Sequence, residues 1–437
     1  MKRIWLLIGV LMVLLAIGSV SAKGSKEAEM EESVQAEKTE QKIETISLLF
    51  GGSTDSRGVE AVCAAAKEKI GIEVELEFTP SDGHEEVIKT RLATGDMSDI
   101  FLYNPGAQMI SIDPQGTMVP LTNESFIKKL DSGFRESVTY KGELYGVPQG
   151  YSMAGGILYN KKIYQKFGLE VPKTWAEFIA NCDVIQQAGE TAIIGSYKDT
   201  WTAQLILLGD YYNVKAAAPD FAAKFTANKA KYATTPEALR SWEKLYETKD
   251  YINKDYLATS YDVALEMLVT GKGAHYPMLS AVVLPLAETY PDQVNDIGIF
   301  PVPSDNEAVN GLTVWPSATF HIFPGSEKID ACKKFLDFYL SEEGQKTLMA
   351  AMPPSGPSHV IGIEMPDNVL GIVKDMIPYF ARGEVTSAME FVTAVKGANC
   401  PQICVECGSQ NATPQEAAKM YDDDCVKLAV QLGLEGW

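Results

Sequence analysis

Between residues 46 and 103 the sequence alternates strand-like and helix-like segments, and this alternation restricts the fold class more than any other feature. The strand-like segments are residues 46–50, 72–78 and 99–103, and the helix-like segments are residues 59–70 and 85–93. In residues 72–78, Ile, Val, Leu and Phe alternate with Glu, which is the period-two pattern of a strand with one wet face. The order predicts βαβ units, hence an α/β protein with a mostly parallel sheet flanked by helices.

Polar and aromatic side chains follow two of these strands at their carboxyl ends. Asp55 comes after the first strand-like segment, and Tyr103, Asn104 and Gln108 come at the end of the third. In open α/β sheets, ligands bind outside the carboxyl ends of the strands. We therefore expect these four residues to contact a ligand.

Residues 140–178 contain two short apolar strands joined without a helix, "LYGVP" and "GGILYN". This predicts one extended passage from one domain into another, with an ordinary strand pair inside a single domain as the alternative. The apolar run at residues 313–323 has the same character. Thr174 with Glu177 and Thr413 with Glu416 have the spacing of helix-opening capping boxes.

The order of motifs in this region resembles the family 1 extracellular solute-binding proteins, the sugar-binding components of ABC importers. The pattern is "G.LYGVP…G.LYNK..Y...GL..P.TW.EF", and the resemblance extends from about residue 45 to the C-terminus. Four further motifs occur in the expected order, namely "GDMSDIFL" (95–102), "VTGKGAHYPM" (269–278), "IGIFPVPS" (297–304) and "FLDFYLSEEGQKTL" (335–348).

The resemblance implies the two-lobed periplasmic-binding-protein fold, type II-like, with a ligand cleft between the lobes. Lobe one is then expected at residues 42–148 plus 318–352, and lobe two at residues 149–317 plus 353–437. Closure of the lobes on the ligand is expected about segments near 148–153 and 315–319. The implied partners are a small sugar and the membrane permease subunits of an ABC importer.

The N-terminus has the pattern of a secretory signal peptide, residues 1–22. Lys2 and Arg3 precede an apolar run that is short for a membrane span, and Val20-Ser21-Ala22 is a small-residue cleavage site. No cysteine lies near Ala22, which favours a soluble periplasmic protein over a lipoprotein. Residues 23–41 are rich in Glu, Lys, Ser and Ala and read as a flexible leader.

The formal net charge is −20, from 38 cationic and 58 anionic side chains. Such a surface opposes binding to nucleic acid, which requires clustered cations. The chain is expected to be a monomer.

No motif indicates catalysis or a cofactor. The four histidines, His84, His275, His321 and His359, lack metal-site spacing, and no nucleophile elbow, dinucleotide or phosphate-loop motif is present. We therefore expect no enzyme activity, no cofactor and no metal. A secreted glycosidase stays as an alternative, because carboxylate pairs are numerous in so acidic a chain.

The cysteines fall into two groups. Cys63, Cys182 and Cys332 lie in helical patterns and are expected to be small buried side chains. Four more lie near the C-terminus, at Cys400, Cys404, Cys407 and Cys425. Their "CPQICVEC" spacing resembles the iron–sulfur motif of radical-SAM enzymes, but a disulfide or a structural metal site suits an exported chain better.

Aromatic residues beside turn-forming residues are the positive signal for a sugar site. Rings match the flat C–H faces of sugars, and Asp, Asn and Gln match their hydroxyls. The candidate stacking rings are Tyr103, Tyr151, Trp201, Tyr276 and Trp315. The alternative is that these rings belong to the hydrophobic core. The identity of the sugar does not follow from the sequence.

Overall fold

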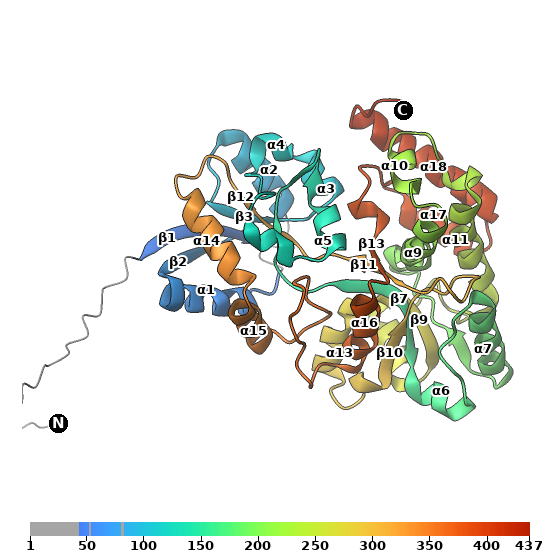
Figure 1. Ribbon diagram of the computed structural model, residues 1–437. Coiled ribbons are helices and arrows are strands. Elements are labelled where there is room, and N and C mark those ends of the chain that lie inside the picture. Colours follow the sequence, from blue (N-terminus) through green and yellow to red (C-terminus); the bar gives the residue numbers. More distant parts are fainter. Residues whose placement is uncertain (1–42, 52–53, 80–82) are drawn as a thin grey trace, which may run out of the picture. The chain divides into compact units, whose positions relative to one another are not determined.

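The structure is a computed structural model that describes residues 43–51, 54–79 and 83–437. The described residues form one compact unit. The predicted signal peptide (1–22) and leader (23–41) lie outside the described residues, as do residues 52, 53 and 80–82. Figure 1 shows the chain coloured along its sequence.

The first of two mixed sheets has the order β2-β1-β3-β12-β6. Its strands are β2 (Ile72–Thr79), β1 (Glu44–Gly51), β3 (Ile100–Tyr103), β12 (Thr319–Ile322) and β6 (Val147–Pro148). The predicted βαβ rhythm is confirmed, because β1 pairs in parallel with both β2 and β3. Strand β12 runs antiparallel to both of its neighbours, β3 and β6.

The second sheet has the order β13-β11-β7-β9-β8, with β10 also paired to β7. Its strands are β13 (Val385–Ser387), β11 (Leu312–Trp315), β7 (Met153–Asn160), β9 (Gly273–Leu279), β8 (Thr191–Ile193) and β10 (Ile297–Phe300). It too is mixed, because β7 runs antiparallel to β9, β10 and β11, whereas β8 pairs in parallel with β9 and β13 in parallel with β11. A separate hairpin joins β4 (Thr139–Tyr140) to β5 (Glu143–Leu144).

Helices flank both sheets. The segments that carry the first sheet contain α1 (Arg57–Ile70), α2 (His84–Thr94), α3 (Ala107–Ser111), α4 (Pro114–Thr117), α5 (Ser132–Ser137), α14 (Ile329–Tyr339) and α15 (Glu342–Ala351). Those that carry the second contain α6 (Lys161–Phe167), α7 (Trp175–Gln187), α8 (Leu205–Gly209), α9 (Tyr211–Ala217), α10 (Phe221–Thr226), α11 (Pro236–Glu247), α12 (Tyr261–Thr270), α13 (Val283–Thr289), α16 (Gly371–Arg382), α17 (Cys400–Gly408) and α18 (Pro414–Gln431).

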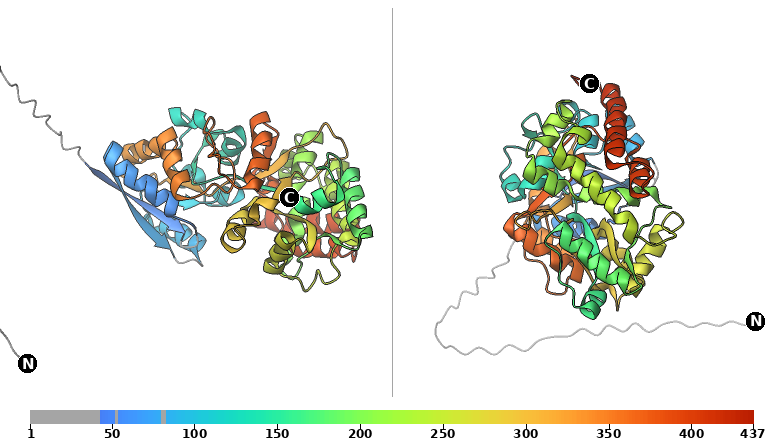
Figure 2. Two further views of the ribbon diagram at one scale, coloured as in Figure 1. Left: turned by 90° about the horizontal axis from the view of Figure 1, so that it is seen from below. Right: turned by 90° about the vertical axis from the view of Figure 1, so that its right-hand side faces the viewer.

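Two of these helices open with the predicted capping boxes. The Thr174 hydroxyl accepts from the Glu177 amide at α7, and the Thr413 hydroxyl accepts from the Glu416 amide at α18. Each pair satisfies amide groups that the first turn would leave free. The red C-terminal helix α18 packs against α11 and α17 (Figure 2).

Strand β7 is buried along almost its whole length, which explains why its sequence is mainly apolar up to its last residue, Asn160. Ala154 and Leu158 face one hydrophobic core, whereas Ile157 and Tyr159 face another on the opposite side of the sheet. A strand buried on both faces needs apolar side chains at every position. The first sheet has its own core, built around strands β1, β3 and β12 and helices α1 and α14.

The chain passes between the two sheets three times. We call residues 149–152, 316–318 and 352–370 the crossing segments, because they join β6 to β7, β11 to β12 and α15 to α16. The apolar run predicted at 313–323 is two strands, interrupted at Pro316, which has no amide hydrogen to donate to a ladder. The lobe boundaries given above stay a prediction.

Candidate functional site

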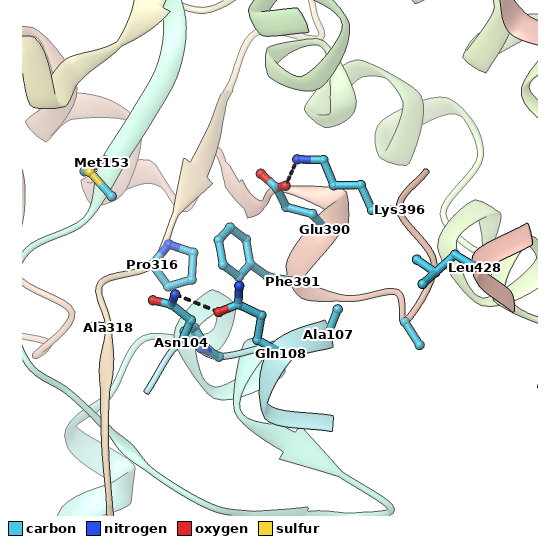
Figure 3. Close-up of a pocket in the computed structure, with 12 residues that line it drawn as sticks. Asn104, Ala107, Gln108, Met153, Pro316, Ala318, Glu390, Phe391, Lys396 and Leu428 are labelled. Atoms are coloured by element: carbon cyan, nitrogen blue, oxygen red, sulfur yellow. Dashed lines mark hydrogen bonds and ion pairs between the residues drawn. The ribbon is translucent and has the colours of Figure 1, made fainter. Parts of the chain in front are cut away.

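A pocket of about 460 Å³ lies where the end of β3, the crossing segment 316–318, the start of β7 and residues 390–396 come together. Its polar side chains are Asn104, Gln108, Glu390 and Lys396, and its apolar surface includes Pro316 and Phe391 (Figure 3). The volume falls in the range of small-molecule sites.

One wall follows β3, as sheet topology predicts. Asn104 and Gln108 are exposed, and the Asn104 side-chain amide donates to Gln108 Oε1 at 2.7 Å. Gly106 lies between them with φ +68°, and a Cβ there would come within 2.4 Å of Phe391 Cα. Only glycine permits this backbone contact between the two sides of the pocket.

The opposite wall is the short 3₁₀ turn Met389–Phe391 and the loop after it. Lys396 forms an ion pair with Glu390, whose carboxylate also accepts a 2.6 Å hydrogen bond from the Trp315 indole. The Trp315 ring packs over Gly155, where a Cβ would lie 2.4 Å from the ring. This wall therefore presents a fixed charged pair beside the aromatic ring of Phe391.

A larger cavity of about 760 Å³ lies between α13, α15 and residues 364–370. Its lining carries no aromatic ring and none of the residues expected from the sequence to bind ligand. The smaller pocket combines a ring with polar side chains from several segments, and we take it as the candidate site.

The sequence-predicted residues divide between the pocket and other places. Asn104 and Gln108 line the pocket. Trp315 stands directly behind it, 7% exposed, in a small cluster with Leu208 and Ala388. The structure therefore brings these three predictions to one place.

Three predicted tyrosines are buried in the hydrophobic cores. Tyr103 and Tyr151 lie in the core of the first sheet, and Tyr276 lies in the core of the second, 1% exposed. The Tyr151 hydroxyl donates to the Met352 carbonyl at 3.1 Å, and the Tyr276 hydroxyl lies 2.7 Å from Ser196 Oγ. Burial raises the pKa of all three phenols, so each hydroxyl keeps its proton.

The remaining two predicted residues lie away from the pocket lining. Trp201 is 40% exposed and its ring centroid is 5.4 Å from that of Tyr261. Asp55 pairs with Arg57 at 2.5 Å, and hydrogen bonding from this guanidinium lowers the pKa of the carboxyl. Whether these residues contact a ligand stays a prediction.

Sequence reasoning missed Glu390, Phe391 and Lys396. They lie in residues 388–396, "AMEFVTAVK", where no glycine, proline or regular period marks a site. An acidic residue next to an aromatic one is the signal that was present, but it is too common to single out this position.

The disulfide considered as one alternative for the C-terminal cysteines is not found. All seven cysteines are buried and unpaired. Cys400, Cys404, Cys407 and Cys425 pack in one core with α11, α17 and α18, where they act as small apolar side chains. Burial raises the pKa of Cys407 and Cys425 to about 12. Among residues 43–51, 54–79 and 83–437, no three His, Cys, Asp or Glu side chains are placed to hold a metal ion.

Comparison with known proteins identifies the fold and the family. Residues 51–346 match the family model described as bacterial extracellular solute-binding protein. The apo form of RafE from Streptococcus pneumoniae superposes with a TM-score of 0.75 at 18% identity, over 89% of this chain and 98% of that one. The fold is therefore the two-lobed α/β fold of the binding proteins, with a cleft between the lobes.

Two curated relatives are similar in sequence. The multiple sugar-binding protein of Streptococcus mutans is 25% identical over 57% of this chain and 59% of its own length. The melibiose/raffinose/stachyose-binding protein of Bacillus subtilis is 22% identical over 72% of this chain and 75% of its own. Within the described part of the chain, no helix combines the length and the apolar character that a bilayer crossing requires.

Proposed function

The chain belongs to the family of bacterial extracellular solute-binding proteins. From this premise we propose that it binds a sugar or oligosaccharide in the pocket that Glu390 and Phe391 line, and delivers it to an ABC importer. The names of its relatives, which include sugar-binding proteins for melibiose, raffinose and stachyose, support this ligand class. Amide and charged groups suit sugar hydroxyls, and the Phe391 ring suits a sugar face.

One observation favours binding over the alternative of a glycosidase. Glu390 is the one carboxylate among the residues that line the pocket, all of which are described, and it is already paired with Lys396 and Trp315. Glycoside hydrolysis ordinarily uses two carboxyl groups, an acid and a base or nucleophile. A site with one neutralised carboxylate suits reversible binding.

The test is to identify what the purified protein carries and what stabilises it. Mass spectrometry of the released compound should find a sugar, and raffinose, melibiose and stachyose should be screened for a thermal shift. A ligand at 100 times its dissociation constant adds about 2.7 kcal/mol to the free energy of unfolding. If no sugar shifts the melting temperature, the proposed ligand class is wrong; if sugar is recovered cleaved, the protein is a glycosidase.

The partners and location in this proposal follow the family. We propose permease subunits of an importer as the partner, a monomer in solution, and export to the periplasm by a signal peptide cleaved near Ala22. N-terminal sequencing of periplasmic protein should begin near Lys23. Material that still begins at Met1 would contradict the cleavage.

A further inference from the structure

His359 lies where all three crossing segments meet. It belongs to the segment 352–370, and its side chain is 2% exposed. Its ring contacts Ser152 of the first crossing segment and Ser317 of the second. The ring also packs on Phe134 of α5, with 4.8 Å between the centroids.

The hydrogen bonds of the ring assign its tautomer. His359 Nδ1 lies 2.9 Å from Asp131 Oδ2, and the Ser317 backbone N–H donates to Nε2 at 3.3 Å. Although burial opposes it, hydrogen bonding to His359 lowers the pKa of Asp131, which is therefore an acceptor. Nδ1 consequently donates to the carboxylate and Nε2 accepts from the amide, so one ring joins Asp131 to the Ser317 backbone.

Backbone contacts complete the same junction. Ser152 N–H donates to the Pro357 carbonyl at 3.0 Å, and Gly150 N–H donates to Ser317 Oγ at 3.2 Å. A Cβ at Gly356 would lie 1.8 Å from the Ser152 carbonyl oxygen, so the first and third crossing segments touch directly. The three segments are therefore packed as one bundle around the imidazole.

This junction adjoins the pocket. Met153, which follows Ser152, lines the pocket, as do Pro316 and Ala318 on either side of Ser317. A shift of Ser152 or Ser317 therefore moves the lining residues next to it in the chain.

The set Ser152, His359 and Asp131 has the composition of a catalytic triad, but its geometry does not serve nucleophilic catalysis. Ser152 is 0% exposed, and although its Oγ lies 3.2 Å from His359 Nε2, the Ser317 amide donates to the same nitrogen. A serine nucleophile needs a free Nε2 to take its proton and a substrate within reach. In this cluster Nε2 is not free to take the serine proton, and the buried Ser152 cannot reach a substrate.

We propose that His359 is a positioning residue, which ties the three crossing segments together and thereby sets how readily the cleft closes on its ligand. This inference rests on the proposed function for the ligand-dependent part of its test. Because apparent affinity falls with the fraction of molecules in the binding-competent arrangement, loosening the junction weakens binding without touching the ligand.

The test compares three substitutions at one position. His359→Ala removes all the hydrogen bonds of the ring, to Asp131, Ser317 and Ser152. His359→Asn keeps a donor for Asp131, and His359→Gln keeps an acceptor for the Ser317 amide. The matched control is His275→Asn. His275 is also a buried, hydrogen-bonded histidine, but its Nδ1 contacts the Ala192 carbonyl and it lies in β9, outside the crossing segments.

Two readouts separate positioning from stability. Raffinose affinity is measured by calorimetry. The distance between the lobes is measured between labels at Glu68→Cys and Lys173→Cys, which are exposed while all native cysteines are buried. We expect His359→Ala to weaken binding about tenfold or more and to broaden the ligand-free distance distribution. His359→Asn and His359→Gln should each restore part of both.

The control variant shows what a purely structural histidine is expected to do. His275→Asn should lower the melting temperature and leave affinity and the distance distribution unchanged. If the His359 variants behave in the same way, His359 is structural only and the proposal is wrong. If the wild type binds no sugar, the proposed function fails, but the ligand-free distances still decide the role of His359. If His359→Ala does not fold, the Asn and Gln variants carry the same comparison.

Discussion

The Trp315 indole donates a 2.6 Å hydrogen bond to Glu390 Oε1, and so joins the end of β11 to the far wall of the pocket. Trp315 is itself fixed, since its ring lies against Gly155 of β7 and is 7% exposed. The carboxylate of Glu390 is thus held at the edge of the pocket by a residue of the sheet, and Lys396 pairs with it from the following loop.

Glu390→Gln should weaken raffinose binding by about tenfold while changing the melting temperature little. The amide oxygen can still accept from Trp315, but the charge that holds Lys396 at the pocket is lost, and hydrogen bonds to charged groups are the stronger ones. Titration calorimetry checks the affinity. The control is Glu266→Gln, which removes the charge that pairs with the exposed Lys272 beside α12, outside the pocket, and should leave binding unchanged. Equal affinities for wild type and Glu390→Gln would remove Glu390 from the site.

Tyr276→Ala and Trp201→Ala should have different effects because one ring is buried and the other is not. Cutting the 1%-exposed ring of Tyr276 should cost about 3–5 kcal/mol of the free energy of unfolding, as for other large core side chains. The Trp201→Ala substitution should lower the free energy of unfolding much less, because the Trp201 side chain is 40% exposed. Chemical denaturation measures both.

Binding by the same two variants tests their predicted role at the ligand. If either ring stacks on a sugar, its loss should weaken binding by roughly 2 kcal/mol, about 30-fold. A Tyr276→Ala protein that binds normally but unfolds far more easily would show that this ring serves the core alone.

Local patterns in the sequence predicted the elements of the first sheet well. The strands and helices between β1 and β3 follow from periodicity, and both capping boxes follow from a single spacing. Such features depend on residues close together in the chain. The pocket does not, because it is assembled from residues 104–108, 316–318 and 390–396, which only the tertiary fold brings together.

The aromatic residues show the same limit. Tyr276 lies between His275 and Pro277 in β9, and its local sequence is the same whether its face of the sheet is open or covered. That face is covered because Leu205, Leu268 and other side chains pack on it, and Tyr276 is therefore buried. Trp315 was predicted to line the cleft as a stacking ring, whereas its indole hydrogen-bonds to Glu390 from behind the pocket lining, and its contact with a ligand stays a prediction.

Raffinose at saturation should reduce the radius of gyration measured by small-angle scattering. The crossing segments 149–152 and 316–318 are the short links about which two lobes can rotate, and a ligand that contacts both walls favours the closed arrangement. The comparison is Glu390→Ala at the same raffinose concentration, which should stay at the ligand-free radius if binding is abolished. An unchanged wild-type radius at proven saturation would count against closure.

Acidification should destabilise the protein through two buried histidines. His275 and His321 are 0% exposed, and desolvation lowers the pKa of each to about 4. In the unfolded chain the pKa of histidine returns to about 6.5. Between these values the unfolded state takes up a proton that the folded state excludes. The free energy of unfolding should therefore decrease as the pH is lowered from about 6.5 towards 4. The decrease is at most about 1.4 kcal/mol per pH unit for each histidine.

Denaturation in urea from pH 7.5 to 5.5 measures this slope, above about pH 5, where carboxylates of lowered pKa such as Asp99 begin to lose their stabilising effect. The matched variants are His275→Asn and His321→Asn, since each keeps a donor for the carbonyl that Nδ1 now contacts, Ala192 or Tyr145. Each variant is expected to be less stable at pH 7.5 but to lose less stability on acidification. Parallel slopes for wild type and the double variant would show that these histidines do not govern the acid response.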